Sequence, residues 1–177
     1  MKQLFLVVAL LALTMTTRAQ ESFLKKDIVG HVGVGVGSYL GDASWRLLVP
    51  PIVLSGEYGI LDSFIRGKAA IGVGGYFAYA MDKIKNDGPS RSHVILGARG
   101  IFHYEFVYRL DTYAGLSLTY ENLSVSNNST STYDSHSLRL FPTIFIGARY
   151  YFSNRFAAFA EVGYGISPLE IGVAIKF

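Results

Sequence analysis

The stretch LEIGVAIKF, residues 169–177, decides how the rest of the chain is interpreted. Its apolar residues occupy every second position as far as the terminal Phe177, and small or charged residues occupy the positions between them. Successive side chains on a strand point to opposite faces, so this segment has one wholly apolar face. The class of the protein depends on which of the two faces looks inward.

The same alternation recurs along the chain and is broken by turn-forming runs such as NDGPS, residues 86–90, and SNNSTST, residues 126–132. No helical periodicity competes with it, and no run of eighteen apolar residues predicts a membrane helix after the first twenty residues. The pattern predicts eight strands, near residues 28–40, 52–60, 68–83, 92–107, 112–124, 136–153, 155–166 and 168–177.

The two faces of these strands differ in kind. One carries Val, Ile, Leu, Phe and Tyr without a charge, and the other carries Gly, Ser, Thr and most of the charged residues. A soluble carrier barrel would put the apolar face inside, but eight strands enclose too little room for so many large side chains. The inverse arrangement puts the apolar face outside, toward lipid. A closed sheet pairs all the backbone N–H and C=O groups of the strands, which lipid requires. The sequence therefore predicts an all-β fold, an eight-stranded antiparallel transmembrane β-barrel with a filled polar interior.

Aromatic residues near the strand ends agree with this interpretation, because amphipathic rings prefer the two membrane interfaces. Tyr and Phe are also common in strands generally. One girdle is expected at Tyr58, Tyr104, Phe106, Tyr150, Phe152 and Phe177, and the other at Tyr79, Tyr120 and Tyr164.

The first nineteen residues have the composition of a secretory signal peptide. Lys2 precedes the apolar run 4–15, and the small residues Thr17 and Ala19 precede the expected cleavage point. The domain organisation is therefore a signal peptide at 1–19 and a barrel domain at 20–177. Cleavage lowers the net charge from +3 to about +1, which predicts no nucleic-acid partner. There is no cysteine, so disulfides do not stabilise the exported chain.

With the leader, the eight alternating segments and the terminal VAIKF, the chain resembles the small eight-stranded outer-membrane barrels of the OmpA/OmpX-like family. The resemblance implies a bacterial outer-membrane location, contact with outer-membrane lipid, and a monomer. It also implies that the outer-membrane assembly machinery reads Val173, Ile175 and Phe177 as a C-terminal signal. Both termini are then periplasmic, and the segments near 41–51, 84–91, 125–135 and 167–168 face outside.

Charged residues on the inward face predict an interior network. A turn centred near residue 130 places Glu121 opposite Arg139, and a turn near residue 109 places Arg99 diagonal to Glu121. Buried charges persist only when they are paired, so Arg99, Glu121 and Arg139 are expected to form a packed core cluster. A path for protons or ions is the functional alternative.

No catalytic, metal or cofactor site is predicted. His31 and His103 are expected at similar depth with Glu57 and Glu105 nearby, but a metal requires three or four converging ligands. The glycines of residues 30–41 keep strict alternation and lack the lysine of a phosphate loop. Asp134, Ser135, His136 and Ser137 contain the residue types of a lipid A deacylase, but Leu138 stands where that motif has Asn. We expect a non-catalytic structural or surface-interaction protein; small-molecule passage through a lateral opening and lipid A modification are the alternatives.

Overall fold

The computed structural model describes residues 23–40, 44–84, 89–126 and 135–177. The predicted signal peptide lies outside these ranges, and the side chains of Trp45, Ser126 and residues 135–138 are not described. Eight strands form a closed barrel in which each strand pairs with its neighbours in sequence, and this confirms the predicted fold. The strands are β1 (Ile28–Val36), β2 (Trp45–Ser63), β3 (Ala69–Ile84), β4 (Ser90–Val107), β5 (Leu110–Ser126), β6 (Ser135–Tyr151), β7 (Phe156–Tyr164) and β8 (Leu169–Lys176).

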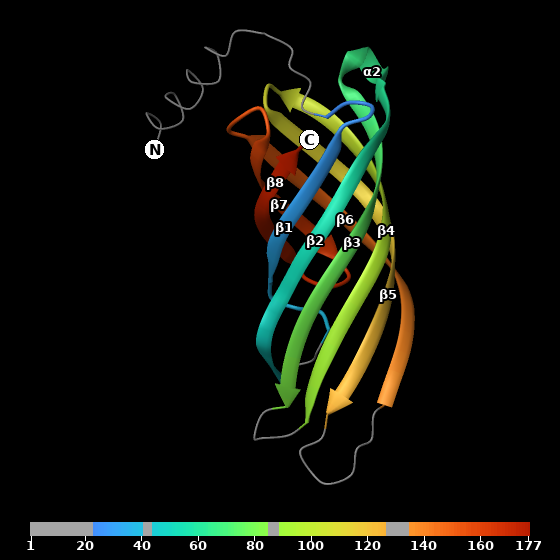
Figure 1. The fold of residues 1–177 in the computed structure, drawn as a ribbon, viewed down its shortest axis with the longest axis vertical. Helices are drawn as coiled ribbons and strands as arrows, with labels where there is room; N and C mark the ends of the chain where they lie inside the picture. Colours follow the sequence, from blue (N-terminus) through green and yellow to red (C-terminus); the bar gives the residue numbers. More distant parts are fainter. Residues whose placement is uncertain (1–22, 41–43, 85–88, 127–134) are drawn as a thin grey trace, which may run out of the picture.

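The barrel closes where β1 meets β8, with Val29 opposite Lys176 and Val36 opposite Leu169. All eight pairings are antiparallel, so every strand within the wall has two neighbours and no open edge faces lipid there. The C-terminus and the short helix α2 (Phe64–Gly67) lie at one end, the upper end in Figure 1. We call this the terminal end and the opposite one the loop end.

Side chains alternate between outward-facing and lumen-facing positions along the strands, as the sequence pattern predicts. Exposed apolar residues cover the outside of the wall, among them Val32, Leu54, Val73, Leu96, Leu116, Leu118, Ile146 and Val173. Buried titratable residues line the inside, among them His31, Glu57, Asp82, His93, Arg99, His103, Asp111, Glu121, Arg149, Glu161 and Glu170. Apolar side chains therefore point outward from the wall, and polar ones fill the lumen, as in transmembrane barrels.

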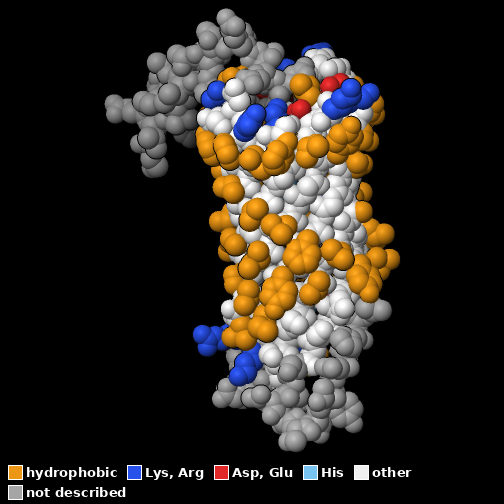
Figure 2. Space-filling view, in the orientation of Figure 1, with side chains coloured by type: hydrophobic (Ala, Val, Ile, Leu, Met, Phe, Trp, Pro, Cys, Tyr) orange, Lys and Arg blue, Asp and Glu red, His pale blue; other side chains and the backbone are white. Residues whose placement is uncertain are grey.

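The outer wall carries two hydrophobic belts with bare backbone between them over part of its surface (Figure 2). The register places Gly30 opposite Gly56, and Gly56 opposite Gly75, across three adjacent strands. A Cβ added at Gly56 or Gly75 would meet no atom within 4 Å, so these glycines face outward into open space. Gly74 faces inward, and a Cβ there would lie 2.3 Å from the carbonyl oxygen of Gly56.

The strands differ in length, which makes the loop end asymmetric. Strands β1, β7 and β8 have nine, nine and eight residues, while β2 to β6 have between 16 and 19. The five long strands therefore extend past the three short ones, as the lower half of Figure 1 shows. The predicted start of the second strand at residue 52 was wrong, because β2 begins at Trp45 and runs through Pro50 and Pro51.

The prolines are tolerated in β2 because this part of the strand pairs on one side only. Its pairing with β1 ends at Ile52, whereas its pairing with β3 continues to Trp45 with register shifts around Val49. A proline lacks the N–H of the ladder, so it suits an edge or a bulge. Pro50 and Pro51 thus signal an edge strand here and not the end of the strand.

Apolar clusters alternate with the charged groups inside the barrel. At the terminal end Phe23, just before β1, packs with Val29, Ala70, Tyr151, Ala157 and Ala174. Its ring stacks on His103 at a centroid distance of 4.0 Å, so the N-terminal segment covers the lumen. Nearer the loop end Val53, Tyr76, Ala78, Ile95 and Ile166 form a second buried cluster. Among the described residues, no helix is long and apolar enough to cross a membrane.

Candidate functional site

The inward faces of the strands bring titratable side chains together in three groups along the lumen. Two of the groups combine residues from strands that are distant in sequence, so the closed sheet positions them, and the third combines residues from three consecutive strands. Their geometry determines whether the lumen acts as a packed core, a path or a reaction site.

The group at the terminal end surrounds Arg149, which is fully buried. Its Nη2 donates to Asp111 Oδ2 at 2.6 Å and to Glu57 Oε2 at 3.1 Å, and its Nη1 contacts Nε2 of His31. The Nδ1 atom of His103 lies 3.1 Å from both carboxylate oxygens of Asp111. The guanidinium therefore joins two carboxylates and a histidine from β1, β2 and β5, and a charge buried in this way is stabilised by its partners.

The middle group is built around Arg99 on β4. Its Nη2 donates to Glu161 Oε2 at 2.7 Å, and its guanidinium carbon lies 3.7 Å from the centre of the Phe145 ring. Glu170 stands opposite Glu161 in the register and accepts a hydrogen bond of 2.7 Å from the Tyr76 hydroxyl. Two carboxylates thus share the interior with one arginine and one phenol.

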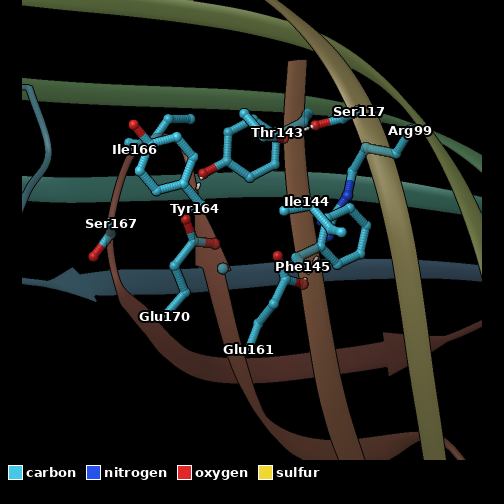
Figure 3. Close-up of a pocket in the computed structure, with 12 residues that line it drawn as sticks. Arg99, Ser117, Thr143, Ile144, Phe145, Glu161, Tyr164, Ile166, Ser167 and Glu170 are labelled. Atoms are coloured by element: carbon cyan, nitrogen blue, oxygen red, sulfur yellow. Dashed lines mark hydrogen bonds and ion pairs between the residues drawn. The ribbon is translucent and has the colours of Figure 1, made fainter. Parts of the chain in front are cut away.

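A small cavity of about 20 Å³ lies beside this middle group. Figure 3 shows Glu161 and Glu170 reaching toward it from β7 and β8, and the hydrogen-bonded pair Ser117 and Thr143 on another side. That volume holds roughly one water molecule. A second interior cavity, beside Phe23 and His103, is about 10 Å³. In the described part of the lumen, these spaces are too small for a continuous channel.

The group at the loop end centres on His93. Its Nδ1 lies 2.7 Å from Glu121 Oε1, and its Nε2 lies 3.5 Å from Asp82 Oδ2. Asp82 also accepts two hydrogen bonds from Arg91, at 2.9 and 2.7 Å. All four residues come from β3, β4 and β5, the strands that extend beyond the short side of the barrel.

The structure separates the three residues predicted to form one network. Glu121 stands opposite Arg139 in the register, as expected, but its described hydrogen bond goes to His93. Arg99 stands opposite Ser117 and bonds Glu161 across the lumen. The β4–β5 hairpin pairs Glu105 with Asp111, which centres the turn one residue earlier than residue 109 and shifts Arg99 two positions along the register.

The histidines at the terminal end converge more than the sequence indicated. His31 Nε2 lies 3.9 Å from Glu57 Oε1, and His103 Nε2 lies 3.8 Å from Glu57 Oε2. The cation Arg149 already occupies the space between them. No group of His, Asp or Glu in the described ranges has the geometry of a metal site. The predicted deacylase-like residues 134–137 lie where side chains are not described.

The C-terminal residues predicted as an assembly signal lie on the outside of β8. Val173 and Phe177 are exposed, and the Phe177 backbone N–H donates to the Ile28 carbonyl at 2.9 Å. Ile175 lies opposite Gly30 on β1 and Phe156 on β7. These positions suit recognition from the membrane side, and the assembly role stays a prediction.

The loop end also has an open side, the feature that the alternative of a lateral opening requires. Described pairing between β6 and β7 begins at Ile144, so residues 135–143 of β6 have a partner only in β5. On the opposite side of the opening, residues 45–51 of β2 pair only with β3. The short turn at 165–168 and the segment at 38–40 lie between these two edges. The Tyr39 N–H donates to the Ile166 carbonyl at 2.8 Å, and Ser167 Oγ lies 3.0 Å from the Gly37 carbonyl.

Leu40 and Phe23 are two residues of the interior that sequence reasoning missed. Both come from segments outside the strands, so alternation gives no information about them. Leu40 packs on the apolar cluster at the loop end, and Phe23 packs on the cluster at the terminal end. The signal in the sequence is that each is a large apolar residue in a connecting segment between polar or small residues and one other apolar or aromatic residue.

Comparison with family models gives no match, and comparison with curated proteins gives none either. Among solved structures, the fold is similar to Ail, the attachment invasion locus protein of Yersinia pestis. That match has a TM-score of 0.53 and 10% identity, and it covers 86% of this chain and 96% of that chain. A designed transmembrane β-barrel matches with a TM-score of 0.52, 18% identity, and coverage of 88% and 98%. The N-terminal barrel of Pseudomonas aeruginosa OprF gives a TM-score of 0.48 at 17% identity, covering 86% and 98%. The matches to Ail and to the designed barrel show that this chain has the fold of the small eight-stranded outer-membrane barrels.

Proposed function

We propose that this chain, with the fold of the small eight-stranded outer-membrane barrels, is a non-catalytic outer-membrane protein that binds partners at the cell surface. The observation that carries the proposal is the edge of β6, residues 135–143, which has no partner besides β5 among the described residues, on a sheet that extends past β7, β8 and β1. Different observations support the membrane location of the protein, its lack of catalysis and its mode of binding.

An outer-membrane location is supported by the exposed apolar belt, by aromatic residues at both ends, and by the signal-peptide composition of residues 1–19. Export and cleavage of the leader would deliver a barrel whose short turns at 151–156 and 107–110 face the periplasm. The loop end would then face outside. The outward position of Val173, Ile175 and Phe177 fits the proposed reading of the last strand by the assembly machinery.

A packed, non-conducting lumen is supported by the interior contacts. Arg149, Arg99 and Arg91 each pair with a buried carboxylate, and the two interior cavities hold about one water molecule each. Such ion pairs fill a barrel core without offering an exposed nucleophile. We therefore favour a structural lumen over passage through it, and propose no cofactor.

The β6 edge suits pairing with an extended polypeptide. Pro142 has no backbone N–H, so its nitrogen faces the unpaired side, and residues 138 and 140 have the same orientation because backbone groups alternate along a strand. The Thr119 hydroxyl bonds the Phe141 carbonyl, which places Phe141 on the β5 side of the alternation. The edge of β2 is interrupted by Pro50 and Pro51 and by its register shifts. The edge of β6 is regular from residue 135 to residue 141. A partner strand would therefore add to β6.

The test measures binding of a labelled, lysine-flanked Thr-Val repeat peptide to the purified barrel in lipid nanodiscs. Leu140→Pro removes one N–H from the free edge while leaving the ladder to β5 intact. Its matched control, Leu140→Ala, removes the same side chain and keeps the N–H. We expect Leu140→Pro to weaken binding at least about fivefold, by loss of a hydrogen bond worth about 1 kcal/mol and by local mismatch. Equal binding by both variants, or none by the parent protein, would refute edge pairing.

A further inference from the structure

A hollow of about 700 Å³ lies on the outer wall of the barrel. Its floor is a row of outward-facing glycines, Gly30, Gly56 and Gly75, which stand opposite one another on β1, β2 and β3. The next outward row toward the loop end is apolar and forms one side of the hollow, with Val32, Leu54, Phe77 and Leu96. Figure 2 shows bare backbone of this kind between the two hydrophobic belts of the wall. We call this hollow the wall trench.

The trench crosses the strands, so it runs obliquely down the wall. Successive outward positions along the hydrogen-bonding direction are Phe156, Ile175, Gly30, Gly56 and Gly75. Phe156 begins β7 at the terminal end, whereas Gly75 lies near the middle of β3. Three strand spacings of about 4.8 Å separate Ile175 from Gly75, a span of about 14 Å. The trench therefore leads from the terminal rim toward the middle of the wall, over a length close to the roughly 15 Å hydrocarbon depth of one leaflet.

The shape of the trench favours a flexible chain over a second barrel. In a two-fold dimer the same patch of both copies meets itself, so two trenches would face each other and enclose a larger gap. Well-packed protein contacts do not leave such gaps. A single hydrocarbon chain can instead lie along the glycine floor beside the apolar row, and the volume is in the range of small-molecule sites. Lipid chains surround this wall in a membrane, so they are the hydrocarbon that reaches it.

The terminal end of the trench is bordered by two cations. Arg155 directly precedes Phe156 of the trench lining, and Lys26 lies just before β1. Both side chains are exposed. The Arg155 carbonyl accepts a 2.7 Å hydrogen bond from the Lys176 N–H, and the Lys176 ammonium pairs with the nearby Asp27 carboxylate at 3.2 Å. Among the described residues, neither Lys26 nor Arg155 has an ion-pair partner, so both are available to an anion at the rim.

We propose that the wall trench holds one acyl chain of an anionic phospholipid, whose phosphate lies at the terminal rim between Lys26 and Arg155. Both cations attract an anionic head group, and the chain follows the trench toward the middle of the membrane. Bulk lipid is as apolar as the trench, so close packing on the bare backbone retains the chain. This site uses the wall of the barrel and not the β6 edge, so it goes beyond the proposed function and is tested independently of it.

Native mass spectrometry of the purified mature barrel tests the trench. The barrel is released from detergent that contains equal amounts of phosphatidylglycerol and phosphatidylethanolamine with identical chains, and we expect one retained lipid per barrel. Gly56→Leu puts an alkyl side chain into open space on the trench floor, so it should lower the retention of both lipids at least about fivefold. Gly100→Leu is the matched control. Gly100 also faces open space but does not line the trench, so this variant should retain lipid as the parent does.

The head-group position is tested by a double variant that combines Lys26→Gln with Arg155→Gln. The parent should retain phosphatidylglycerol about fivefold better than phosphatidylethanolamine, as expected for two exposed ion pairs, and the double variant should lose this preference. Arg66→Gln combined with Lys68→Gln removes two exposed cations beside α2, at the same end of the barrel, and should keep the preference.

Heat-modifiable gel mobility verifies the folding of each variant. Equal lipid retention by Gly56→Leu and Gly100→Leu, or no preference for phosphatidylglycerol in the parent, would overturn the proposal. The same loss of preference in both charge variants would overturn the placement of the phosphate between Lys26 and Arg155. A dimer of the parent that Gly56→Leu abolishes would assign the trench to a second copy of the chain and would overturn the lipid assignment.

Discussion

Glu161 Oε2 lies 2.7 Å from Nη2 of Arg99, although the two residues are 62 positions apart and sit on strands that are not neighbours. The ion pair spans the lumen between β4 and β7, so it exists only when the barrel is closed. Tyr113 supports it through a 3.3 Å hydrogen bond from its hydroxyl to the same carboxylate oxygen. This contact makes the middle of the lumen a sensitive place to test the packed-core interpretation.

The first prediction concerns the loss of one partner of this pair. Arg99→Met should lower the free energy of unfolding by about 3–5 kcal/mol, because it leaves the Glu161 carboxylate buried without its cation. The double variant Arg99→Met with Glu161→Gln should recover most of that loss. Reversible urea unfolding in lipid, followed by fluorescence, measures both. If the single and double variants are equally unstable, the ion pair is not the source of the effect.

A second prediction uses two adjacent glycines that face opposite ways. Gly74→Ala should destabilise the barrel by about 1–3 kcal/mol, because its Cβ would collide with the Gly56 backbone carbonyl. Gly75→Ala puts the same methyl group into open space outside the wall and should leave the unfolding free energy nearly unchanged. Unfolding of the two variants under identical lipid conditions provides the comparison. Greater damage from Gly75→Ala would reverse the assignment of the two faces.

A third prediction addresses the lipid-facing wall directly. Leu118 is 54% exposed on the outside of β5, so Leu118→Arg should cost about 2–4 kcal/mol of unfolding free energy if it lies near the middle of the membrane. Leu118→Met keeps the position apolar and should change stability by less than about 1.5 kcal/mol. In water, a barrel with this same structure would tolerate a charge at this exposed position. Equal stability of the Arg and Met variants would therefore contradict a membrane wall.

The alternation of side chains was sufficient to predict the closed barrel and most of the lumen-facing residues, because burial in a strand follows a period of two. The register between strands was harder to predict, because a shift of one residue in the centre of the β4–β5 turn moves the β5 partner of every β4 residue by two positions. That is why Arg99 meets Glu161 and not Glu121. Thr119 shows a further limit: alternation indicates that it faces the lumen, but not that it is fully buried and donates a hydrogen bond to the Phe141 carbonyl.

Residues outside the strands could not be placed from the sequence. Leu40 and Phe23 enter the lumen from connecting segments, and their contacts depend on strand lengths that differ around the barrel. The start of β2 was misplaced because it depends on pairing with β3 alone, and Pro50 and Pro51 are acceptable there since β1 is not paired with this part of the strand. The open side of the loop end follows from these same unequal lengths.

The fourth prediction separates assembly from stability. Phe177 is 75% exposed, and Phe177→Ala keeps the backbone bond to Ile28, so the finished barrel should lose little stability. If the terminal residue is an assembly signal, the variant should nevertheless reach the outer membrane more slowly in a pulse-chase measurement. Phe152→Ala removes another exposed aromatic at the same end and should assemble at the normal rate. Equal assembly rates for the two variants would show that Phe177 has no special role.

The last prediction tests which end of the barrel faces outside. The chain has no cysteine, so a single introduced thiol reports its own location without background. Ser44→Cys lies at the loop end and Asn154→Cys lies in the β6–β7 turn at the terminal end, and both positions are exposed. A membrane-impermeant maleimide added to intact cells should label Ser44→Cys and leave Asn154→Cys unlabelled, while both should react after the outer membrane is permeabilised. The permeabilised sample serves as the control, because it shows that each thiol is reactive. Labelling of Asn154→Cys alone in intact cells would show that the barrel has the opposite orientation. The β6 edge would then lie in the periplasm, where it could not bind a partner at the cell surface.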